Sequence, residues 1–187
     1  MAKIKDFPSF LRGRESWNNN WQAQWTRNVQ TAASGRVRTM TTQMYPLWVI
    51  YLQYNSLTDK EADELQGFLN QCSNCYFWYK DYQRYRETNQ ILAKNANGTY
   101  QCVINIGGFI EPALRVDNVT VYKNGVPTTD FTVADGKISL KISVTDRDVI
   151  TADYDYYFKC RCRDSTYTIN RNFINSNNVA LYLCVVR

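Results

Sequence analysis

Runs of apolar residues alternate with polar residues along much of this chain, with the two-residue period of β-strands. The runs are rich in Val, Ile, Tyr and Phe, and Gly, Asn, Asp or Pro separates them. Successive side chains of a strand point to opposite faces of its sheet, so this period predicts strands with one buried face. We expect strands at residues 36–42, 46–54, 76–81, 100–106, 119–123, 131–133, 137–144, 156–162 and 179–186.

One segment has the period of an α-helix instead. Thr58 and Glu61 have the spacing of a capping box, in which each side chain binds the backbone amide of the other residue. We expect a helix over residues 59–71 that packs on the sheet containing Val49 and Tyr51. Four apolar residues have the spacing that places them on its packed face: Ala62, Leu65, Phe68 and Leu69.

Two dipeptides mark tight turns in the second half of the chain. Asn124-Gly125 and Asp135-Gly136 combine residues that tolerate a positive φ angle, which the turns of two-residue hairpins require. We therefore expect a hairpin at each dipeptide. Residues 108–155 are a candidate for a separate β-hairpin subdomain.

The first 35 residues lack this clear β pattern and contain three tryptophans. Trp17, Trp21 and Trp25 recur at every fourth position, which is the spacing of a helix face, but the asparagines between the first two are poor helix formers. An irregular arm is the alternative to a helix. Trp is enriched at protein interfaces, so the three residues are candidate contacts with a neighbouring subunit. The alternative is that they fill the subunit's own core.

Together these elements predict the fold class and the division of the chain into an arm and a domain. The 187 residues, of which 44% are hydrophobic and 21% charged, suffice for one globular domain with a small appendage. We expect a mainly β protein with one helix, built as a β-barrel or a sandwich, with a smaller β-rich appendage. Its parts are an N-terminal aromatic-rich arm, residues 1–35, and a β-rich domain, residues 36–187.

The composition excludes several classes of function. Histidine is absent, so the chain has no Ser-His-Asp triad, no Cys-His pair and no histidine general base. The net charge of +5 is modest and spread along the chain, and no nucleic-acid-binding motif accompanies it. The longest apolar run, from Leu47 to Leu52, is far shorter than the roughly 20 residues of a membrane span. We expect a non-enzymatic protein without a secretion signal, a membrane span or nucleic-acid specificity.

Six cysteines leave one question of chemistry open. In the absence of a secretion signal we expect reduced, structural thiols and no bound cofactor. Cys72 and Cys75 have the spacing of half a zinc knuckle, and Cys160 and Cys162 point to the same side of an expected strand. The alternative is a zinc ion or an iron–sulfur cluster at these four residues.

Four aspartates close together in the sequence raise the question of calcium binding. These residues are Asp146, Asp148, Asp153 and Asp155. The segment from Asp146 to Asp153 lacks the mid-loop Gly and the terminal Glu of an EF-hand. We therefore expect this segment to be a polar turn between two strands.

The order of these features resembles the distal tail (Dit-like) proteins of long-tailed bacteriophages and gene transfer agents. The resemblance spans nearly the whole chain and rests on order and spacing. The chain departs from the family pattern at residues 82–85, where members often carry a second Asp, and in its Trp-rich segment and its cysteines. The matching segments are Phe7-Pro8, Thr31–Gly35 with Arg38, Pro46–Trp48, Leu57–Leu69, Phe77–Asp81, Ile110–Pro112, Val119–Gly125, Gly136–Ile138, Ile150–Asp153 and Phe158–Arg161.

The resemblance implies a structural, non-enzymatic protein of the virion tail, made in the host cytoplasm. It implies a ring of six copies that joins the tail tube to the tail tip or baseplate. The implied partners are further copies of the chain, the tail tube protein and the tail-tip hub proteins. Two other hypotheses remain: a receptor- or carbohydrate-binding β-domain at the tail tip, and a tail-tip protein that carries an iron–sulfur cluster.

Overall fold

The computed structural model describes residues 4–145, 147–164 and 167–187, and these residues form mainly β-strands. Strands account for 54% of the chain and helical residues for 9%. The expected class, mainly β with one α-helix, is therefore confirmed for the described residues. Their strands form several sheets in a sandwich-like arrangement, and none of these sheets closes into a barrel.

The elements of the first half of the described chain are β1 (Lys5–Asp6), the 3-10 helix η1 (Ser9–Leu11), β2 (Asn20–Gln24), β3 (Arg27–Thr31), β4 (Val37–Thr41), β5 (Leu47–Leu57), α1 (Asp59–Gln71), β6 (Phe77–Tyr79) and β7 (Arg86–Ile91). Those of the second half are β8 (Tyr100–Gln101), β9 (Val103–Ile106), β10 (Phe109–Pro112), β11 (Arg115–Lys123), β12 (Val126–Thr128), β13 (Phe131–Ala134), β14 (Lys137–Leu140), β15 (Ile150–Cys162), β16 (Thr168–Phe173) and β17 (Ser176–Val185).

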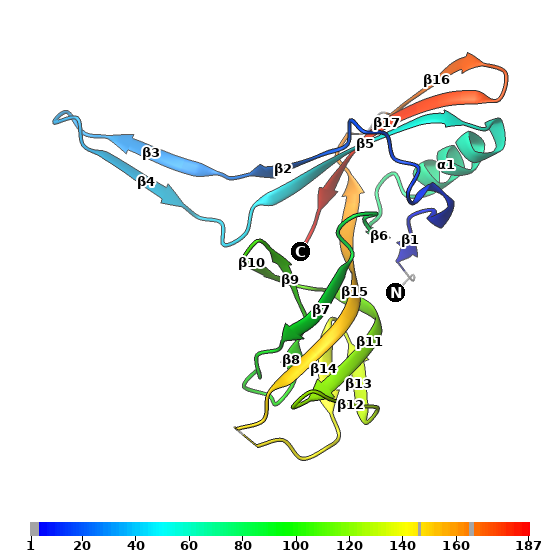
Figure 1. Ribbon diagram of the computed structural model, residues 1–187. Coiled ribbons are helices and arrows are strands. Elements are labelled where there is room, and N and C mark those ends of the chain that lie inside the picture. The colour runs from blue at the N-terminus through cyan, green and yellow to red at the C-terminus, as the bar shows by residue number, and fades with distance from the viewer. Residues whose placement is uncertain (1–3, 146, 165–166) are drawn as a thin grey trace.

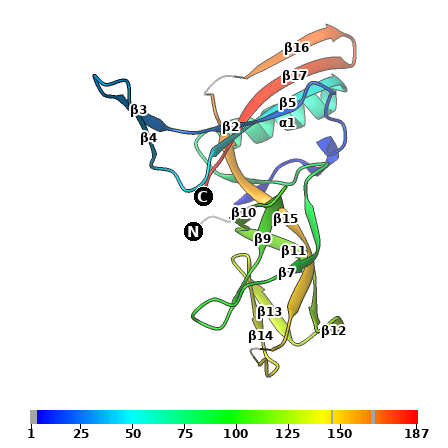
Figure 2. The ribbon, with the colours of Figure 1, turned by 60° about the vertical axis from the view of Figure 1, so that its left-hand side comes forward.

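Three parts meet at the centre of the molecule (Figure 1). The body contains α1 and the strands β1, β5, β6, β16 and β17. A long arm, formed by β3 and β4 and continued by the adjoining ends of β2 and β5, projects from one side of the body. A lobe that contains β7 to β14 lies below. Figure 2 shows β15 running from the lobe into the body, so that it belongs to both.

The body is built on a sheet with the strand order β1-β6-β15-β17-β5-β2, and β16 lies beside β17. Its central pair, β5 and β17, is antiparallel and places Ile50 opposite Leu183 and Leu52 opposite Leu181. All four side chains are buried. Val49 and Cys184, which pair on the opposite face, are buried as well, so these two strands form the centre of the body.

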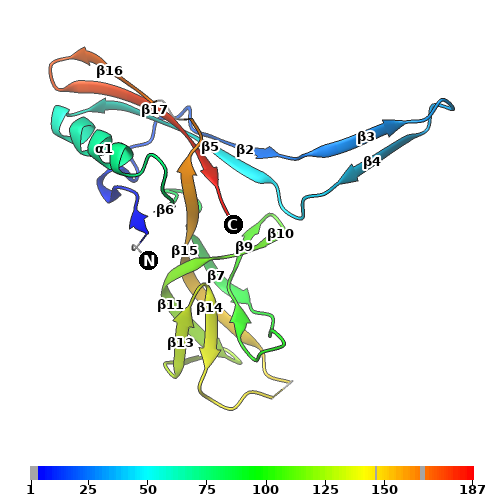
Figure 3. The same ribbon diagram turned by 180° about the vertical axis from the view of Figure 1, so that it is seen from behind.

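The helix α1 has the predicted bounds and the predicted cap. The Thr58 hydroxyl accepts a hydrogen bond from the Glu61 amide at 3.3 Å, and the Glu61 carboxylate accepts one from the Thr58 amide at 2.9 Å. Ala62, Leu65 and Leu69 are buried, as predicted. Seen from behind, α1 lies under β5 and β17, on the opposite side of the body from the arm (Figure 3).

The helix packs on the sheet that contains Val49 and Tyr51, as predicted. The buried cluster that contains Leu65 also contains Ile50, Leu52 and Tyr54 of β5. Tyr51 lies on the other face, with its ring centroid 4.8 Å from that of Tyr182. The prediction named this sheet but not the face, because the run in β5 is apolar on both sides and its pattern does not distinguish the two faces.

The N-terminal segment forms a strand and half of a hairpin, where a helix or an irregular arm was expected. β2 pairs antiparallel with β5, and Trp21 lies opposite Ile50 in this pair. β3 then pairs with β4, and the chain turns at Gly35, which has a φ angle of 78°. The boundary drawn between residues 35 and 36 therefore falls in the turn of a hairpin.

The lobe consists largely of hairpins, and the two predicted turns are present. Asn124 and Gly125 have φ angles of 53° and 81° between β11 and β12. Asp135 and Gly136 have φ angles of 48° and 68° between β13 and β14. The expected subdomain, residues 108–155, lies within the lobe, but the lobe begins earlier, at β7, and shares β15 with the body.

Several strands, among them β7 and β16, are present where the sequence pattern predicts none. β7 has the sequence RETNQI and β16 the sequence TINRNF, and every residue of both is exposed or half-buried. β7 pairs with β15, and β16 pairs with β17. Backbone hydrogen bonds to a well-packed neighbour hold these strands in place, so their own sequences need no apolar face.

We expect Leu65→Ala to lower the free energy of unfolding by about 2–5 kcal/mol, because it removes buried methyl groups and leaves a cavity under α1. Urea unfolding measures the change. Gln66→Ala, at the neighbouring exposed position, is the control and should change stability by less than about 0.5 kcal/mol. Equal unfolding midpoints for the two variants would contradict this packing.

Candidate functional site

The arm is exposed along its length and carries charge of one sign. Every residue of β3 and β4 is exposed. From residue 16 to residue 58 the sequence contains no Asp, Glu or Lys, and its charged residues are Arg27, Arg36 and Arg38. All three belong to the hairpin or to its turn. The arm therefore presents a basic surface to its surroundings.

Apolar side chains are exposed on the same hairpin. Val29, Val37 and Met40 have 57%, 60% and 63% of their surface exposed. The register of β3 and β4 places Val29 and Val37 on one face. A hairpin of two strands without a core is marginally stable in water, and burying each such side chain against a partner stabilises by about 1.5–3 kcal/mol. The arm is therefore suited to lie against another protein surface.

A buried carboxylate fixes the root of the arm. Glu111 of β10 is 3% exposed, and its Oε1 accepts a hydrogen bond from the Trp48 indole of β5 at 2.7 Å. Its other oxygen pairs with Arg187 at 2.6 Å, and Arg187 also donates to the carbonyl of Pro46 at 2.7 Å. These contacts tie β5, the lobe and the C-terminal strand together where the arm begins.

The structure separates the three tryptophans that the sequence groups together. Trp17 is fully exposed, and Trp25 is 37% exposed, with its ring 6.4 Å from that of Phe109. Trp21 is half-buried against Phe158, at 4.9 Å between ring centroids. Trp21 thus packs against the subunit's own core, and the choice between the two predicted roles stays open. An interface role for Trp17 and Trp25 stays a prediction.

A groove of about 700 Å³ lies beside the root of the arm. Trp17, Trp21 and Trp48 line it together with the carboxyl groups of Glu15 and Asp81. Burial raises the pKa of both carboxyl groups. No sequence pattern predicted this groove, because its residues come from three distant segments and no spacing connects them.

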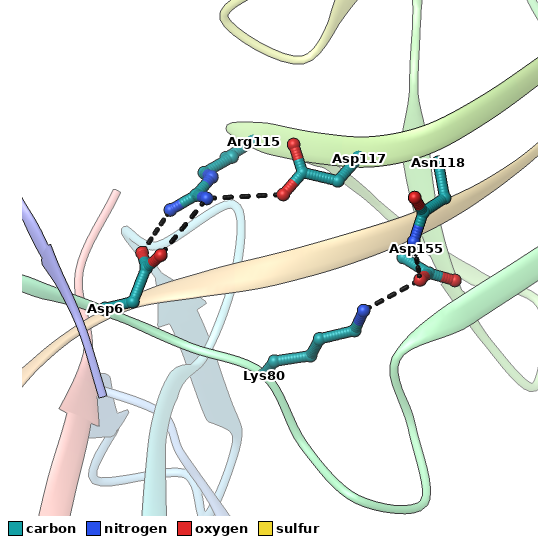
Figure 4. Close-up of polar contacts among 6 residues, drawn as sticks. All are labelled: Asp6, Lys80, Arg115, Asp117, Asn118 and Asp155. Carbon is teal, nitrogen blue, oxygen red and sulfur yellow. Dashed lines mark hydrogen bonds and ion pairs between the residues drawn. The ribbon is translucent and has the colours of Figure 1, made fainter. Parts of the chain in front are cut away.

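A network of charges joins the body to the lobe (Figure 4). Lys80, which follows β6, pairs with Asp155 of β15 at 2.7 Å, and the Asn118 amide donates to the same carboxylate oxygen at 2.8 Å. Arg115 of β11 pairs with Asp6 of β1 and, at 3.2 Å, with Asp117. Two ion pairs, on separate strands, thus connect the two parts.

Asp155 is the central group of this network. It is 4% exposed, and burial alone would raise its pKa, but the hydrogen bonds from Lys80 and Asn118 hold the pKa below its usual value. Asp153 and Asp155 both lie within β15, whereas the polar turn was expected to extend from Asp146 to Asp153. Asp148 does lie in a turn, where it pairs with Lys123 at 3.1 Å. Asp146 lies outside the described residues.

The six cysteines are free thiols in different environments. Cys72, Cys102, Cys160 and Cys184 are buried, Cys162 is half-buried and Cys75 is exposed. Burial raises the pKa of Cys102 to about 12 and also raises that of Cys160. Among the described residues no three metal-ligating side chains come together. The alternative of a metal or cluster at Cys72, Cys75, Cys160 and Cys162 thus gains no support.

Comparison with known proteins adds no assignment. A search with models of known protein families finds no match to this chain, and a search of curated proteins finds no similar protein. In the part of the chain that the structure describes, no helix has the length and apolar character needed to cross a membrane.

We expect Lys80→Met to lower the free energy of unfolding at neutral pH by about 2–3 kcal/mol. The loss is smaller than the roughly 3–5 kcal/mol typical of a broken buried pair, because Asn118 still contacts Asp155. The folded protein lowers the pKa of Asp155, so the contribution is present above about pH 4 and is lost as the pH falls through the lowered pKa.

Urea unfolding at neutral and acidic pH measures both effects. Lys60→Met is the matched control, because Lys60 pairs with Glu64 at 3.9 Å on the exposed surface of α1, where such a pair contributes less than about 1 kcal/mol. An equal loss for the two variants, or a loss from Lys80→Met that persists at acidic pH, would show that Asp155 does not depend on this partner.

We expect a thiol reagent to modify one cysteine quickly in the folded protein and all six in denaturant. The quick reaction should come from exposed Cys75, because burial and raised pKa values protect the others. Cys75→Ser should remove the quick phase and leave five thiols in denaturant. Fewer than six thiols in the denatured wild-type protein would indicate a disulfide or a bound metal.

Proposed function

We propose that this protein is a structural component of the tail of a bacteriophage or gene transfer agent. In this proposal, six copies form a closed ring that joins the tail tube to the tail tip or baseplate. The tail location and the copy number come from the resemblance to distal tail proteins. The observation that carries the proposal is the projecting arm, which has exposed apolar residues and no core of its own.

The geometry of the arm supports a head-to-tail contact between subunits. A strand rises about 3.3 Å per residue, so the ten residues from Gln24 to Ala33 reach about 30 Å from the body. The arm and the surface it reaches differ in shape and sequence. Contacts between two different surfaces of identical subunits are heterologous, and they form a ring when the rotation closes.

Charge favours one surface of the next subunit as the acceptor. The arm carries arginines and no acidic residue, whereas the first two turns of α1 carry Asp59, Asp63 and Glu64 with exposed side chains. The helix α1 lies on the opposite side of the body from the arm (Figure 1). An arm that lies against this helix of the next copy brings opposite charges together and continues around a ring.

The test removes the arm and asks whether the tail still assembles. A variant in which Asn-Gly replaces residues 27–41 joins the two chain segments where the hairpin begins. We expect this variant to fold with an unchanged unfolding temperature and to fail to enter tails in a complementation assay. The double variant Val29→Thr and Val37→Thr should reduce incorporation at least tenfold.

The matched control is Phe173→Ser with Ile174→Ser, which removes exposed apolar side chains from the β16–β17 turn. It should leave incorporation unchanged. Equal incorporation of the arm variants and the control would contradict a role for the arm. A reconstruction of the tail that places this chain outside a rotationally symmetric ring at the end of the tube would overturn the proposed function.

A further inference from the structure

The groove beside the root of the arm has the dimensions of a ligand site. Its volume of about 700 Å³ lies within the range of roughly 300–1,000 Å³ that is usual for small-molecule sites. One wall comes from the segment before β2, and the other from the loop after Lys80. Trp48 of β5 lines it together with Trp21.

Aromatic side chains dominate its apolar surface. Trp21 and Trp48 pack edge to face at 6.0 Å, and both are half-buried. Trp17 stands at the groove with its indole fully exposed, so no part of the described chain covers the ring. An exposed indole offers a flat, electron-rich face, which stacks well on the C–H face of a pyranose ring.

Polar groups of both kinds line the same groove. Asn20, Gln83 and Arg84 are exposed there, and each side chain is free of hydrogen bonds and ion pairs within the described residues. An amide both donates and accepts, as a sugar hydroxyl does, and a guanidinium donates to hydroxyl oxygens. The nearby carboxyl groups of Glu15 and Asp81 offset the charge of Arg84. This mixture favours a neutral ligand rich in hydroxyl groups over an anion.

The walls of the groove are held in place before any ligand binds. The Asp81 carboxylate accepts hydrogen bonds from the amides of Tyr82 and Arg84, each at 2.9 Å. The Glu15 carboxylate accepts one from the Gly13 amide at 2.6 Å. The Tyr82 ring packs on Gly13, where a β-carbon would lie 3.1 Å from the ring. A site that is already formed binds without the entropic loss of ordering its loops.

We propose that this groove binds a neutral oligosaccharide, stacked on Trp17 and hydrogen-bonded by Asn20 and Gln83. This binding is a second activity, and it does not depend on the ring assembly proposed above. The bound sugar covers the one fully exposed indole of the groove, and its hydroxyl groups take up the free amide donors and acceptors.

The test uses ligand-observed NMR on the purified, unassembled protein with three neutral probes: maltotriose, cellotriose and triacetylchitotriose. We expect saturation transfer to at least one of them. Trp17→Ala should weaken its binding at least tenfold, and Gln83→Ala should weaken it less. Trp25→Ala is the matched control, because Trp25 is also exposed but lies outside the groove, and it should bind as the wild type does.

Three results would overturn the proposal. The first is the absence of saturation transfer to all three trisaccharides from a protein whose unfolding temperature shows that it is folded. The second is an equal loss of binding for Trp17→Ala and Trp25→Ala. The third is that no sugar binds while Trp17→Ala blocks incorporation into tails, which would assign the groove to a neighbouring protein. Loss of incorporation in the arm variants with sugar binding intact would separate the two proposals.

Discussion

The backbone hydrogen bonds of β15 hold the two main parts of this molecule in one arrangement. The strand is thirteen residues long; its first half pairs with β7 and β11, and its second half pairs with β6 and β17. Every second residue is buried, so Ala152 and Tyr154 pack in the lobe while Phe158 and Cys160 pack in the body. The pairing with β7 and with β11 shifts register within the lobe, where bulges allow the strand to twist before it enters the body. The pair of Lys80 with Asp155 lies at the crossing point and adds an electrostatic contact to the shared backbone.

Local signals in the sequence were sufficient for much of this fold. The capping box at Thr58 and the turn dipeptides at residues 124 and 135 act within a few residues, and the structure contains all three. The hydrophobic pattern did not predict polar strands such as β16. Backbone hydrogen bonds to a neighbouring strand hold them in place, so their sequences need no apolar periodicity. The length of β15 was underestimated because its first residues include two aspartates, which are unusual in strands. Those aspartates are tolerated because Lys80, Asn118, Tyr122 and the Asn89 amide bind them.

The candidate sites were less predictable than the fold, because they depend on residues that are far apart in sequence. The spacing of four residues between Trp17, Trp21 and Trp25 suggested that they share one surface. In the structure, β2 directs Trp21 against Phe158, whereas Trp17 and Trp25 are exposed. Trp48 and Asp81 reach the groove only through the pairing of β2 with β5 and the loop after β6. The sequence predicted one of the two strands of the arm: the strand at residues 36–42 was expected, but its partner β3 was not. β3 has one apolar residue, Val29, among polar ones, so it leaves little trace in a hydrophobic pattern.

The pairing of β5 with β17 also constrains how the protein reaches its native state during synthesis. Ile50 meets Leu183 in this pair, so the centre of the body joins residues more than a hundred positions apart. The ribosome must release the residues up to β17 before β17 can pair with β5, and until then this edge of β5 has unpaired backbone groups. Sheets whose strands are far apart in sequence form slowly, and their unpaired edges are prone to aggregation until the last strand has been added. The hairpins of the lobe, by contrast, close locally and can form while translation continues.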